Sequence, residues 1–454
     1  MPDAPLNFDV VVVGAGPAGL AAACVAAESK KHVALVDETP WLGGQIWRGQ
    51  DHKPNQSPKG SSKAAAQRWL TRFRNSGATL LDQTTVIAAP EKDLLLAEKE
   101  GAPLQLRWKR LVLATGAREL FLPFPGWTLP GVIGPGGLQA LVKNGWPIEG
   151  QRVLLAGSGP LLLAVAAGLR HHGAQVVAIV EQASRRNVNR FGLGLWRHPS
   201  KLWQGVNLKL GISGVPYHCG AWPVRAEGAD HVQRVTLTNG HKTWQVECDY
   251  LACGFGLVPN VELPLLLGCD LSDGFVRVDS YQATSVPNVY CAGEPTGIGG
   301  ADCALVEGQI AGYAVSEQTA QAERLFAARR SWHQFRRAMA EAFALRPDVK
   351  ALADDMTIVC RCEDVTLGQL RAFKGWREAK LQTRCGMGAC QGRTCAAATR
   401  EILGWGMESV RPPVLPSRVR SLISVRQSNE LSPTLSETTA EPARRKQLGT
   451  ASVA

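Results

Sequence analysis

The sequence predicts an α/β fold in which two β-α-β units precede a small helical domain rich in cysteine. Two observations lead to this prediction. A glycine-rich turn follows an apolar strand and opens a helix at two places, and five of the 12 cysteines lie between Cys360 and Cys395. Strands that are apolar along their whole length are buried on both faces, which is typical of parallel sheets. The length of 454 residues fits about two to four domains.

The first unit lies at the N-terminus. We expect a strand at Phe8–Val13, a helix at Leu20–Glu28 and a second strand at Val33–Val36. The turn before the helix is Gly14-Ala15-Gly16-Pro17-Ala18-Gly19. In this pattern the first glycine permits a tight turn, the second lets a pyrophosphate approach the backbone, and the third lets the helix pack closely on the strand. The unit therefore predicts a dinucleotide-binding site of the Rossmann type.

The residues around this turn predict how the ligand lies. The phosphates would sit at the helix N-terminus, where free N–H groups favour an anion. Asp37, or Glu38 beside it, ends the second strand and would accept hydrogen bonds from the ribose hydroxyls. The turn alone does not separate FAD from NAD.

The second unit is a weaker match to the same pattern. It has a strand at Arg152–Ala156, a helix at Leu161–Leu169 and a strand at Gln175–Val180, around the turn Gly157-x-Gly159-x-x-Leu162. A bulky leucine replaces the third glycine. Glu181 ends the last strand and suits a free ribose hydroxyl, which favours NAD(H) over NADP(H). The alternative is a domain that packs but binds no NAD, or binds another adenine nucleotide.

Further segments resemble the two-dinucleotide-domain flavoproteins, a family that includes thioredoxin and glutathione reductases. They are Gly43-Gly44-Gln45, Thr115-Gly116 and Ala292-Gly293-Glu294. In that family the late motif is usually Gly-Asp and contacts FAD, whereas this chain has Gly293-Glu294. The resemblance implies that the first site holds FAD. The residues that we expect to bind FAD are Gly14, Gly16, Pro17, Ala18, Gly19, Asp37, Glu38, Gly44, Gln45, Arg48, Val86, Thr115, Gly116, Gly293, Glu294 and Ala301.

The clustered cysteines predict a metal site. Cys360-Arg361-Cys362 precedes Cys385, Cys390 and Cys395. Thiolates suit iron–sulfur clusters or zinc, and a [2Fe–2S] cluster needs four of them, so one is surplus. Zinc is the alternative, although the Cys-x-Cys spacing is tight for it. No Cys-x-x-Cys pair lies in either dinucleotide unit, so dithiol chemistry of the thioredoxin-reductase kind has no residues to run on.

The cysteine segment resembles the [2Fe–2S] domain of bacterioferritin-associated ferredoxin. In that family a Cys-x-Cys pair precedes a Cys-x-x-Cys pair, and the last cysteine begins a helix. Here a helix is expected at Ala396–Leu403, directly after Cys395. The resemblance implies that Cys385 lies near the cluster without ligating it. The implied ligands are Cys360, Cys362, Cys390 and Cys395.

The combination of segments resembles the α-type subunits of opine oxidases, D-hydroxyproline dehydrogenases and hydrogen cyanide synthase. The most specific segments are Cys360-Arg361-Cys362-Glu363 and Gly386–Arg393. The resemblance implies an FAD-dependent oxidoreductase, one subunit of a complex that oxidises CH–NH or CH–NH₂ donors. A partner flavoprotein of the D-amino-acid-oxidase type would oxidise the C–N bond, and this chain would relay the electrons. A small ferredoxin-like subunit is a further possible partner.

Two other functions are compatible with the sequence. One is a stand-alone NAD(P)H-dependent reductase that passes electrons through FAD to the cluster. The other is a scaffold subunit whose cluster is structural. His171 and His172 end an apolar helix and are better explained as surface or capping residues than as a catalytic pair. We name no catalytic acid or base.

Composition narrows the class of protein. With 45% hydrophobic and 20% charged residues, the chain resembles ordinary soluble globular proteins. The net charge is +11, but the basic residues form no stripe of the kind that binds nucleic acid. No apolar stretch is long enough to span a bilayer, and no basic region followed by an apolar core begins the chain. We therefore expect a cytoplasmic protein, with peripheral membrane contact left open.

The expected domain boundaries follow from these motifs. The first dinucleotide domain comprises residues 1–125 and 266–320, and the second comprises residues 126–265. A helical connector at 321–355 leads to the [2Fe–2S] domain at 356–425. The last segment, 426–454, is rich in Ser, Thr, Glu and Pro, and we expect it to be disordered.

Overall fold

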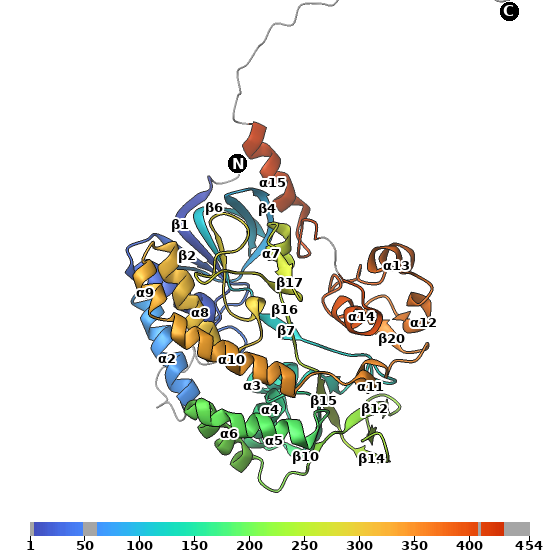
Figure 1. The fold of residues 1–454 in the computed structure, drawn as a ribbon. Coiled ribbons are helices and arrows are strands. Elements are labelled where there is room, and N and C mark those ends of the chain that lie inside the picture. The colour runs from blue at the N-terminus through green and yellow to red at the C-terminus, as the bar shows by residue number, and fades with distance from the viewer. Residues whose placement is uncertain (1–3, 49–60, 407–409, 431–454) are drawn as a thin grey trace, which may run out of the picture.

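The computed structural model describes residues 4–48, 61–406 and 410–430, and Figure 1 shows their arrangement. The second described range begins with a helix at Ser61. Most of the predicted disordered tail lies outside the described residues.

The first domain is built on a sheet with the strand order β3-β2-β1-β6-β5-β4, and β19 pairs with β6. β1 is parallel to both β2 and β6, so it lies in the middle of the sheet, and its apolar residues from Phe8 to Val13 are buried. Two helices, α1 and α8, pack against each other over this sheet. The elements are β1 (Leu6–Val13), α1 (Pro17–Glu28), β2 (Val33–Val36), α2 (Ser61–Arg74), β3 (Thr79–Leu81), β4 (Thr84–Glu91), β5 (Leu94–Lys99), β6 (Ala102–Leu113), β19 (Val289–Cys291), η2 (Glu294–Thr296) and α8 (Gly300–Val315).

The second domain has a sheet with the order β11-β10-β9-β15-β8 and a separate antiparallel sheet, β12-β13-β14. Its parallel strands are apolar, and α3 and α4 pack together beside them. The elements are β8 (Val132–Ile133), α3 (Pro135–Lys143), β9 (Arg152–Gly157), α4 (Leu161–His171), β10 (Gln175–Glu181), α5 (Arg185–Gly194), η1 (Leu195–Arg197), α6 (Pro199–Gly211), β11 (Tyr217–Cys219), β12 (Trp222–Glu227), β13 (Arg234–Thr238), β14 (Thr243–Glu247) and β15 (Tyr250–Gly254).

Two short antiparallel strands join the domains, because the chain leaves the first domain through β7 and returns through β16. Helices then lead from α8 along both domains to the cysteine domain, as Figure 1 shows. These elements are β7 (Ala117–Glu119), β16 (Leu257–Pro259), α7 (Glu262–Leu266), β17 (Leu271–Ser272), β18 (Phe275–Val276), α9 (Thr319–Glu323), α10 (Phe326–Ala342) and α11 (Pro347–Lys350).

The cysteine domain is a small unit of short helices and one two-stranded sheet. Its core contains Cys360, Cys385 and Cys395 together with Val359, Leu370 and their neighbours. Its elements are β20 (Ile358–Cys360), β21 (Val365–Thr366), α12 (Leu367–Leu370), α13 (Trp376–Thr383) and α14 (Cys395–Leu403).

The C-terminal boundary of this domain differs from the prediction. Val414 N–H already bonds to Ile87 O in the first domain, and Leu415 packs on the cluster that contains Ile87. The helix α15 (Val419–Glu430) then lies against β5 and β6 of the first domain. Residues from 414 to 425 therefore belong to the first domain, and residues 426–430 are helical. The sequence offered no signal for this long-range contact.

The α/β fold with two Rossmann-like domains is confirmed. Both predicted β-α-β units form, with ends that agree to within a few residues. Strand β6, which pairs with β1 in the first domain, begins at Ala102 and lies outside these two units. Among the described residues no helix is long and apolar enough to cross a bilayer.

Candidate functional site

The first glycine turn forms a cradle at the N-terminus of α1. A Cβ atom on Gly19 would lie 1.7 Å from Gly14 O, so close packing of helix and strand requires glycine here. A Cβ atom on Gly16 would meet nothing within 4 Å, so this residue faces open space. Pro17 occupies the first turn of α1, and no side chain caps the helix. The free N–H groups and open space fit a pyrophosphate.

The acidic residues after β2 have separate positions. Asp37 accepts hydrogen bonds from Ala15 N–H at 2.5 Å and from the Thr39 backbone and hydroxyl. Its carboxylate therefore holds the glycine turn in shape. Glu38 is exposed. Of the two residues expected at the ribose, the structure commits Asp37 to the protein's own backbone and leaves Glu38 as the accessible carboxylate.

The segment after β2 lies on the same cradle. Gly43 N–H donates to Ala15 O, and a Cβ atom on Gly44 would be 3.0 Å from the Gly16 Cα atom. Arg48 donates to Gln45 Oε1 at 2.5 Å, and its buried Nε has no hydrogen-bond partner among the described residues. A buried donor without a partner is costly, and a phosphate or flavin oxygen would satisfy it. The expected positions of Gly44, Gln45 and Arg48 at the site are consistent with this geometry.

Val86 marks the other end of the cradle. It is buried in β4, whose first residue Thr84 donates its N–H to Asp37 O. β4 therefore starts beside the acidic end of β2. This position fits the adenine end of a dinucleotide.

The segment after β6 is held by Asn260. Thr115 Oγ1 donates to Asn260 O at 2.6 Å, and Asn260 Nδ2 donates back to Thr115 O at 2.8 Å. Asn260 N–H also bonds to Gly116 O. Thr115 and Gly116 are thus fixed at the hinge between the two domains. The Thr115 hydroxyl donates its hydrogen to Asn260 O and so has no hydrogen left to donate to a ligand.

Gly293 and Glu294 connect β19 with α8. A Cβ atom on Gly293 would lie 2.9 Å from the Ala18 Cβ atom, so the turn fits tightly against α1. The Glu294 carboxylate accepts from the N–H groups of Gly299 and Gly300 and so caps α8, which places Ala301 in the first turn of that helix. Burial raises the pKa of Glu294 to about 7. Its extra methylene, relative to aspartate, lets the side chain reach the helix rather than point away from it.

A buried polar group that sequence reasoning missed supports this turn. Glu307 of α8 is 1% exposed and accepts hydrogen bonds from Gly293 N–H at 2.9 Å and Thr296 Oγ1 at 3.0 Å. On its other oxygen it bonds to His333 Nε2 at 2.8 Å, and Cys303 Sγ is 3.6 Å away. No motif marks Glu307, and only its acidic side chain in an otherwise small and apolar helix could have drawn attention to it.

The second glycine turn is hydrogen-bonded to other groups of the protein. The Glu181 carboxylate accepts from Gly159 N–H at 2.7 Å and from Ala183 N–H at 2.8 Å, and its burial raises its pKa to about 7. Ser158 Oγ donates to Phe343 O at 3.1 Å, just beyond α10. Glu181 is fully buried and occupies the N–H group that a pyrophosphate would use. The structure thus brings the three predicted residues together. A Cβ atom on Gly159 would meet nothing within 4 Å, so the turn borders open space although Glu181 accepts its N–H group.

Gln182 adds further hydrogen bonds between this turn and the chain beyond α10. Its Nε2 donates to Ser158 Oγ at 2.9 Å and to Ala344 O at 3.1 Å, and its Oε1 accepts from Arg346 N–H at 3.1 Å. The chain at 343–346 is therefore bonded directly to the second glycine turn and the residue after β10. In the sequence, the only indication of this role was that Gln182 is polar and follows Glu181, the predicted ribose ligand.

All five clustered cysteines come together in the cysteine domain. The Sγ atoms of Cys360, Cys385 and Cys395 lie within 4.8 Å of one another, and Cys362 hydrogen-bonds to Cys390. Gly386 N–H donates to Cys360 Sγ at 3.5 Å. Hydrogen bonds from the Cys385 and Cys395 thiols lower the pKa of Cys360 to about 2. Thiols with backbone N–H donors suit an iron–sulfur cluster.

The position of Cys385 bears on the choice of ligands. It is fully buried between Cys360 and Cys395, whereas Cys362 is exposed and Cys390 is half-buried. Cys385 therefore lies among the other clustered cysteines. The distances between the Sγ atoms would also allow Cys385 to be a ligand. The ligand set Cys360, Cys362, Cys390 and Cys395 therefore stays a prediction.

The cysteine domain faces the hinge between the dinucleotide domains. A cavity of about 480 Å³ is lined on one side by cysteines 360, 362, 390 and 395 and on the other by Phe121, Trp127 and Gly134. Trp127 Nε1 donates to Ile358 O at 2.7 Å, and Arg118 Nε donates to Arg393 O at 2.9 Å. Arg118 also bonds to Asn260, which holds Thr115. A chain of hydrogen bonds through Asn260 and Arg118 thus links the expected flavin segment to the cysteine loop at Arg393.

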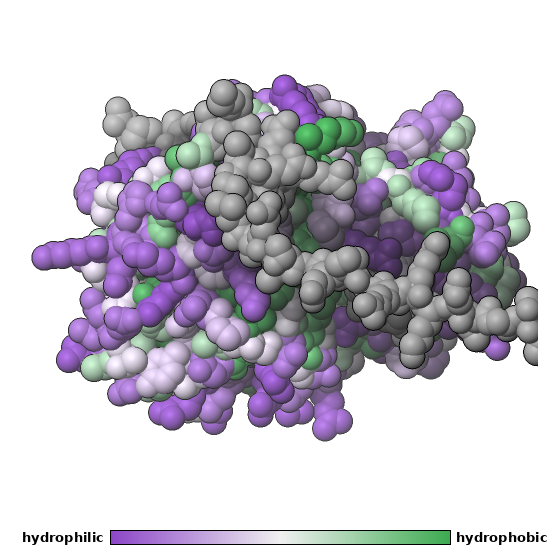
Figure 2. Space-filling model, turned by 90° about the horizontal axis from the view of Figure 1, so that it is seen from above, coloured by the Kyte–Doolittle hydropathy of each residue, from purple (hydrophilic) through white to green (hydrophobic). Residues whose placement is uncertain are grey.

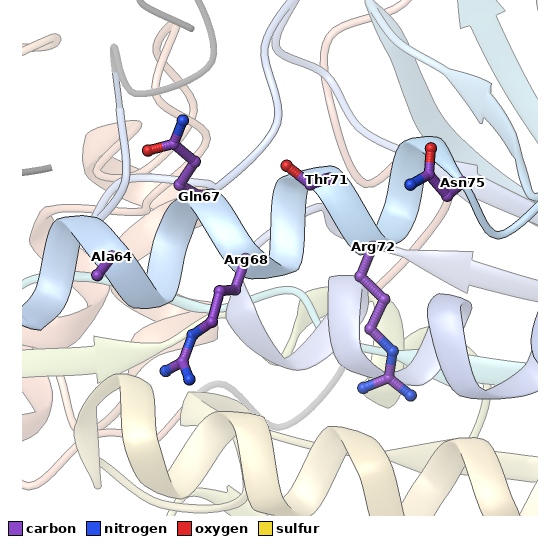
Figure 3. Close-up of a pocket in the computed structure, with 6 residues that line it drawn as sticks. All are labelled: Ala64, Gln67, Arg68, Thr71, Arg72 and Asn75. Carbon is purple, nitrogen blue, oxygen red and sulfur yellow. The ribbon is translucent and has the colours of Figure 1, made fainter. Parts of the chain in front are cut away.

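A second hollow, along α2, does not form such a site. It is open to solvent, and Figure 3 shows Gln67 and Arg68 pointing to opposite sides of the helix. Arg72 is bonded to Glu28 at 2.6 Å. Its polar groups do not converge on one point.

The fold and the glycine cradle define an oxidoreductase of the two-dinucleotide-domain class. Residues 8–322 match the model of the pyridine nucleotide-disulphide oxidoreductase family. An opine oxidase subunit of Rhizobium meliloti is 32% identical over 90% of this chain and 97% of its own. Hydrogen cyanide synthase subunit HcnB of Pseudomonas aeruginosa is 32% identical over 88% of this chain and 95% of its own.

Solved structures agree with the fold. L-proline dehydrogenase from P. horikoshii has a TM-score of 0.66 at 21% identity, covering 92% of this chain and 80% of that one. Thioredoxin reductase of T. acidophilum has a TM-score of 0.53 at 22% identity, covering 69% of this chain and 99% of its own.

The chain belongs to the pyridine nucleotide-disulphide oxidoreductase family, within the group that contains hydrogen cyanide synthase subunit HcnB and the opine oxidase subunit of Rhizobium meliloti. Membership implies an FAD-binding oxidoreductase subunit, as the sequence predicted.

Proposed function

We propose that the chain is an FAD- and [2Fe–2S]-containing electron-transfer subunit of a heteromeric amino-acid or opine dehydrogenase. A partner subunit of the D-amino-acid-oxidase type would oxidise the C–N bond. The observation that carries the proposal is the contact of the cysteine domain with the hinge, through Arg118 and Trp127, beside Thr115 and Gly116. A scaffold with a structural cluster would not need this placement next to the flavin segment.

The residues of this chain fit both prosthetic groups. The α1 N-terminus and Arg48 would hold the FAD phosphates, and the Gly293 turn with α8 would flank the flavin. The cysteine loop would hold the cluster between the buried Cys360 and Cys395 and the more accessible Cys362 and Cys390. When bound, FAD and the cluster supply redox chemistry that the side chains lack. The protein would hold and orient the two groups.

The electron relay is tested by changing one expected ligand in the assembled complex. Cys390→Ser should abolish the electron paramagnetic resonance signal of the reduced cluster. It should also lower electron transfer from amine substrate to acceptor on the order of tenfold or more, because one-electron exit is lost. Full activity in this variant would contradict the relay. Cys219→Ser, a half-buried thiol on β11, is the matched control.

The same measurement decides the ligand set. Cys385→Ser should keep the cluster, with iron and acid-labile sulfide contents like those of the unmodified protein, if Cys385 is the surplus thiol. Loss of the cluster in Cys385→Ser and retention in Cys390→Ser would reverse the assignment. Zinc in place of iron and sulfide would support the zinc alternative.

A stand-alone NAD(P)H-dependent reductase is less well supported. Glu181, Ser158 and Gln182 bind the chain's own backbone at the second glycine turn. We therefore expect the isolated chain, with FAD bound, to oxidise neither NADH nor NADPH in steady-state assays. Turnover with either nucleotide would contradict this expectation and restore the reductase hypothesis.

A further inference from the structure

A helical hairpin at one end of the molecule has no role in the sites described above. It consists of α5, η1 and α6, residues 185–211, and we call it the basic hairpin. Figure 1 shows it at the lower end of the molecule, opposite α15. One side of it faces the protein and the other faces solvent.

The inner side of the basic hairpin is firmly anchored. Phe191 contacts the rings of Phe335 and Phe343, with centroids 5.7 and 5.3 Å apart. Lys201 forms an ion pair of 2.7 Å with Asp302 in the first turn of α8. The hairpin is therefore fixed to the connector and to the helix beside the expected flavin. Its outer side is presented in a defined orientation.

The outer side carries large apolar groups. Leu193 is 77% exposed, Trp196 68% and Trp203 64%. Val206 and Leu210 follow Trp203 at three and seven residues, so the three side chains share one face of α6. Apolar groups gathered on one exposed surface, rather than scattered singly, mark a binding surface.

The same segment carries only positive charge. No aspartate or glutamate occurs between Glu181 and Glu227. The exposed cations on the hairpin are Arg185, Arg186, Arg190, Arg197 and Lys209. A partner that complements the hairpin would have an anionic surface for the cations and an apolar layer below that surface for the exposed apolar side chains.

We propose that the basic hairpin is a docking surface for an anionic lipid bilayer. Interfacial helices have tryptophan and leucine on the buried face and lysine and arginine around them, and tryptophan prefers the headgroup region. A protein partner would have to present an acidic surface that matches the hairpin in both charge and register. The hairpin has one sign only. A bilayer, which needs no register, fits it better than an acidic protein.

The position of the hairpin suits a peripheral contact rather than a span. The opposite end of the molecule, seen in Figure 2, is mostly hydrophilic with scattered small apolar areas. The docked hairpin would be joined to α8 by the ion pair between Lys201 and Asp302. This inference does not depend on the proposed electron relay.

Vesicle flotation of the full chain with FAD tests the proposal. The chain should float with vesicles of phosphatidylcholine and phosphatidylglycerol, bind vesicles of phosphatidylcholine alone at least tenfold more weakly, and be released by salt. The double variant Trp196→Ser, Trp203→Ser should lower binding to the anionic vesicles on the order of tenfold. The triple variant Arg190→Gln, Arg197→Gln, Lys209→Gln should remove the preference for phosphatidylglycerol.

Leu381→Ser is the control, because Leu381 is 63% exposed on α13 in the cysteine domain. It should bind vesicles like the unmodified chain. Circular dichroism and FAD content should match in all variants. Absence of flotation, or equal flotation of the tryptophan variant, would overturn the proposal. So would hairpin variants that bind vesicles normally but no longer assemble with the partner subunit, since the surface would then be a protein interface.

Discussion

At the scale of single residues, two glycines of the same turn have different tasks. Gly19 is needed by the fold, because any side chain would collide with Gly14 O. Gly16 is extended, with φ −71° and ψ −177°, and faces open space, so the protein alone would accept alanine there. The difference separates stability from ligand binding within one motif.

Substitutions at these two glycines should therefore have opposite signatures. Gly16→Ala should leave the unfolding free energy of the FAD-free protein within about 0.5 kcal/mol and weaken FAD on the order of tenfold or more. Gly19→Ala should lower that free energy by about 1–3 kcal/mol. Denaturant unfolding and FAD titration measure the two effects. Equal losses of stability in both variants would argue against this division.

Glu181 gives the second glycine turn a pH dependence. Burial raises its pKa to about 7 in the folded state, so between about pH 4.5 and 7 the folded protein binds more protons at this group than the unfolded chain does. Its contribution to stability therefore falls as the pH rises through this range. Glu181→Gln should remove about 1 kcal/mol per pH unit of this decline.

Denaturant unfolding at several pH values, with the unmodified chain as reference, measures that change. Glu294 has a similarly raised pKa, so part of the decline should remain in the variant. Glu149→Gln, at an exposed position before β9, should leave the pH profile unchanged. An unaltered slope in Glu181→Gln would show that the carboxyl is ionised in the folded protein.

At the scale of elements, the contact between the cysteine domain and the hinge depends on a few polar groups. Trp127→Phe keeps the ring but removes the hydrogen bond to Ile358 O, at a cost of about 1 kcal/mol. We expect faster proteolytic cleavage between α11 and β20, and slower electron transfer from flavin to cluster in rapid-mixing experiments.

Trp146→Phe is the matched control for that variant. Trp146 Nε1 donates to the Tyr250 hydroxyl at 3.1 Å, within the second domain. It should change neither the cleavage pattern nor the electron-transfer rate. If both variants behave like the unmodified chain, the hydrogen bond at Trp127 does not hold the cysteine domain in place.

At the scale of the whole molecule, the sequence predicted what is local and missed what is distant. The glycine turns, the apolar strands and the grouping of the cysteines each depend on neighbouring residues, and each formed as expected. The return of residues from Val414 onward to the first domain depends on pairing with Ile87, which no local pattern signals. The same reason explains the hydrogen bond at Ser158, because its partner is 185 residues away.

Site assignment followed the same division. Positions fixed by backbone geometry, such as Gly16 and Gly19, could be assigned from the motif. Side chains whose role depends on tertiary partners could not. Asp37 and Glu294 are acidic at the expected places, yet both carboxylates accept hydrogen bonds from the backbone of their own domain.

The backbone at Phe343 and Ala344, which bonds to Ser158 and Gln182, bears on which donors can reduce the flavin. If reduced nicotinamide nucleotides cannot enter, they cannot load the flavin. The amine substrate of the partner subunit then has no rival donor for this carrier. The second Rossmann-like domain would then keep NAD(P)H from reducing the flavin. The rate of the complex would depend on the amine concentration and not on the ratio of reduced to oxidised nicotinamide nucleotides.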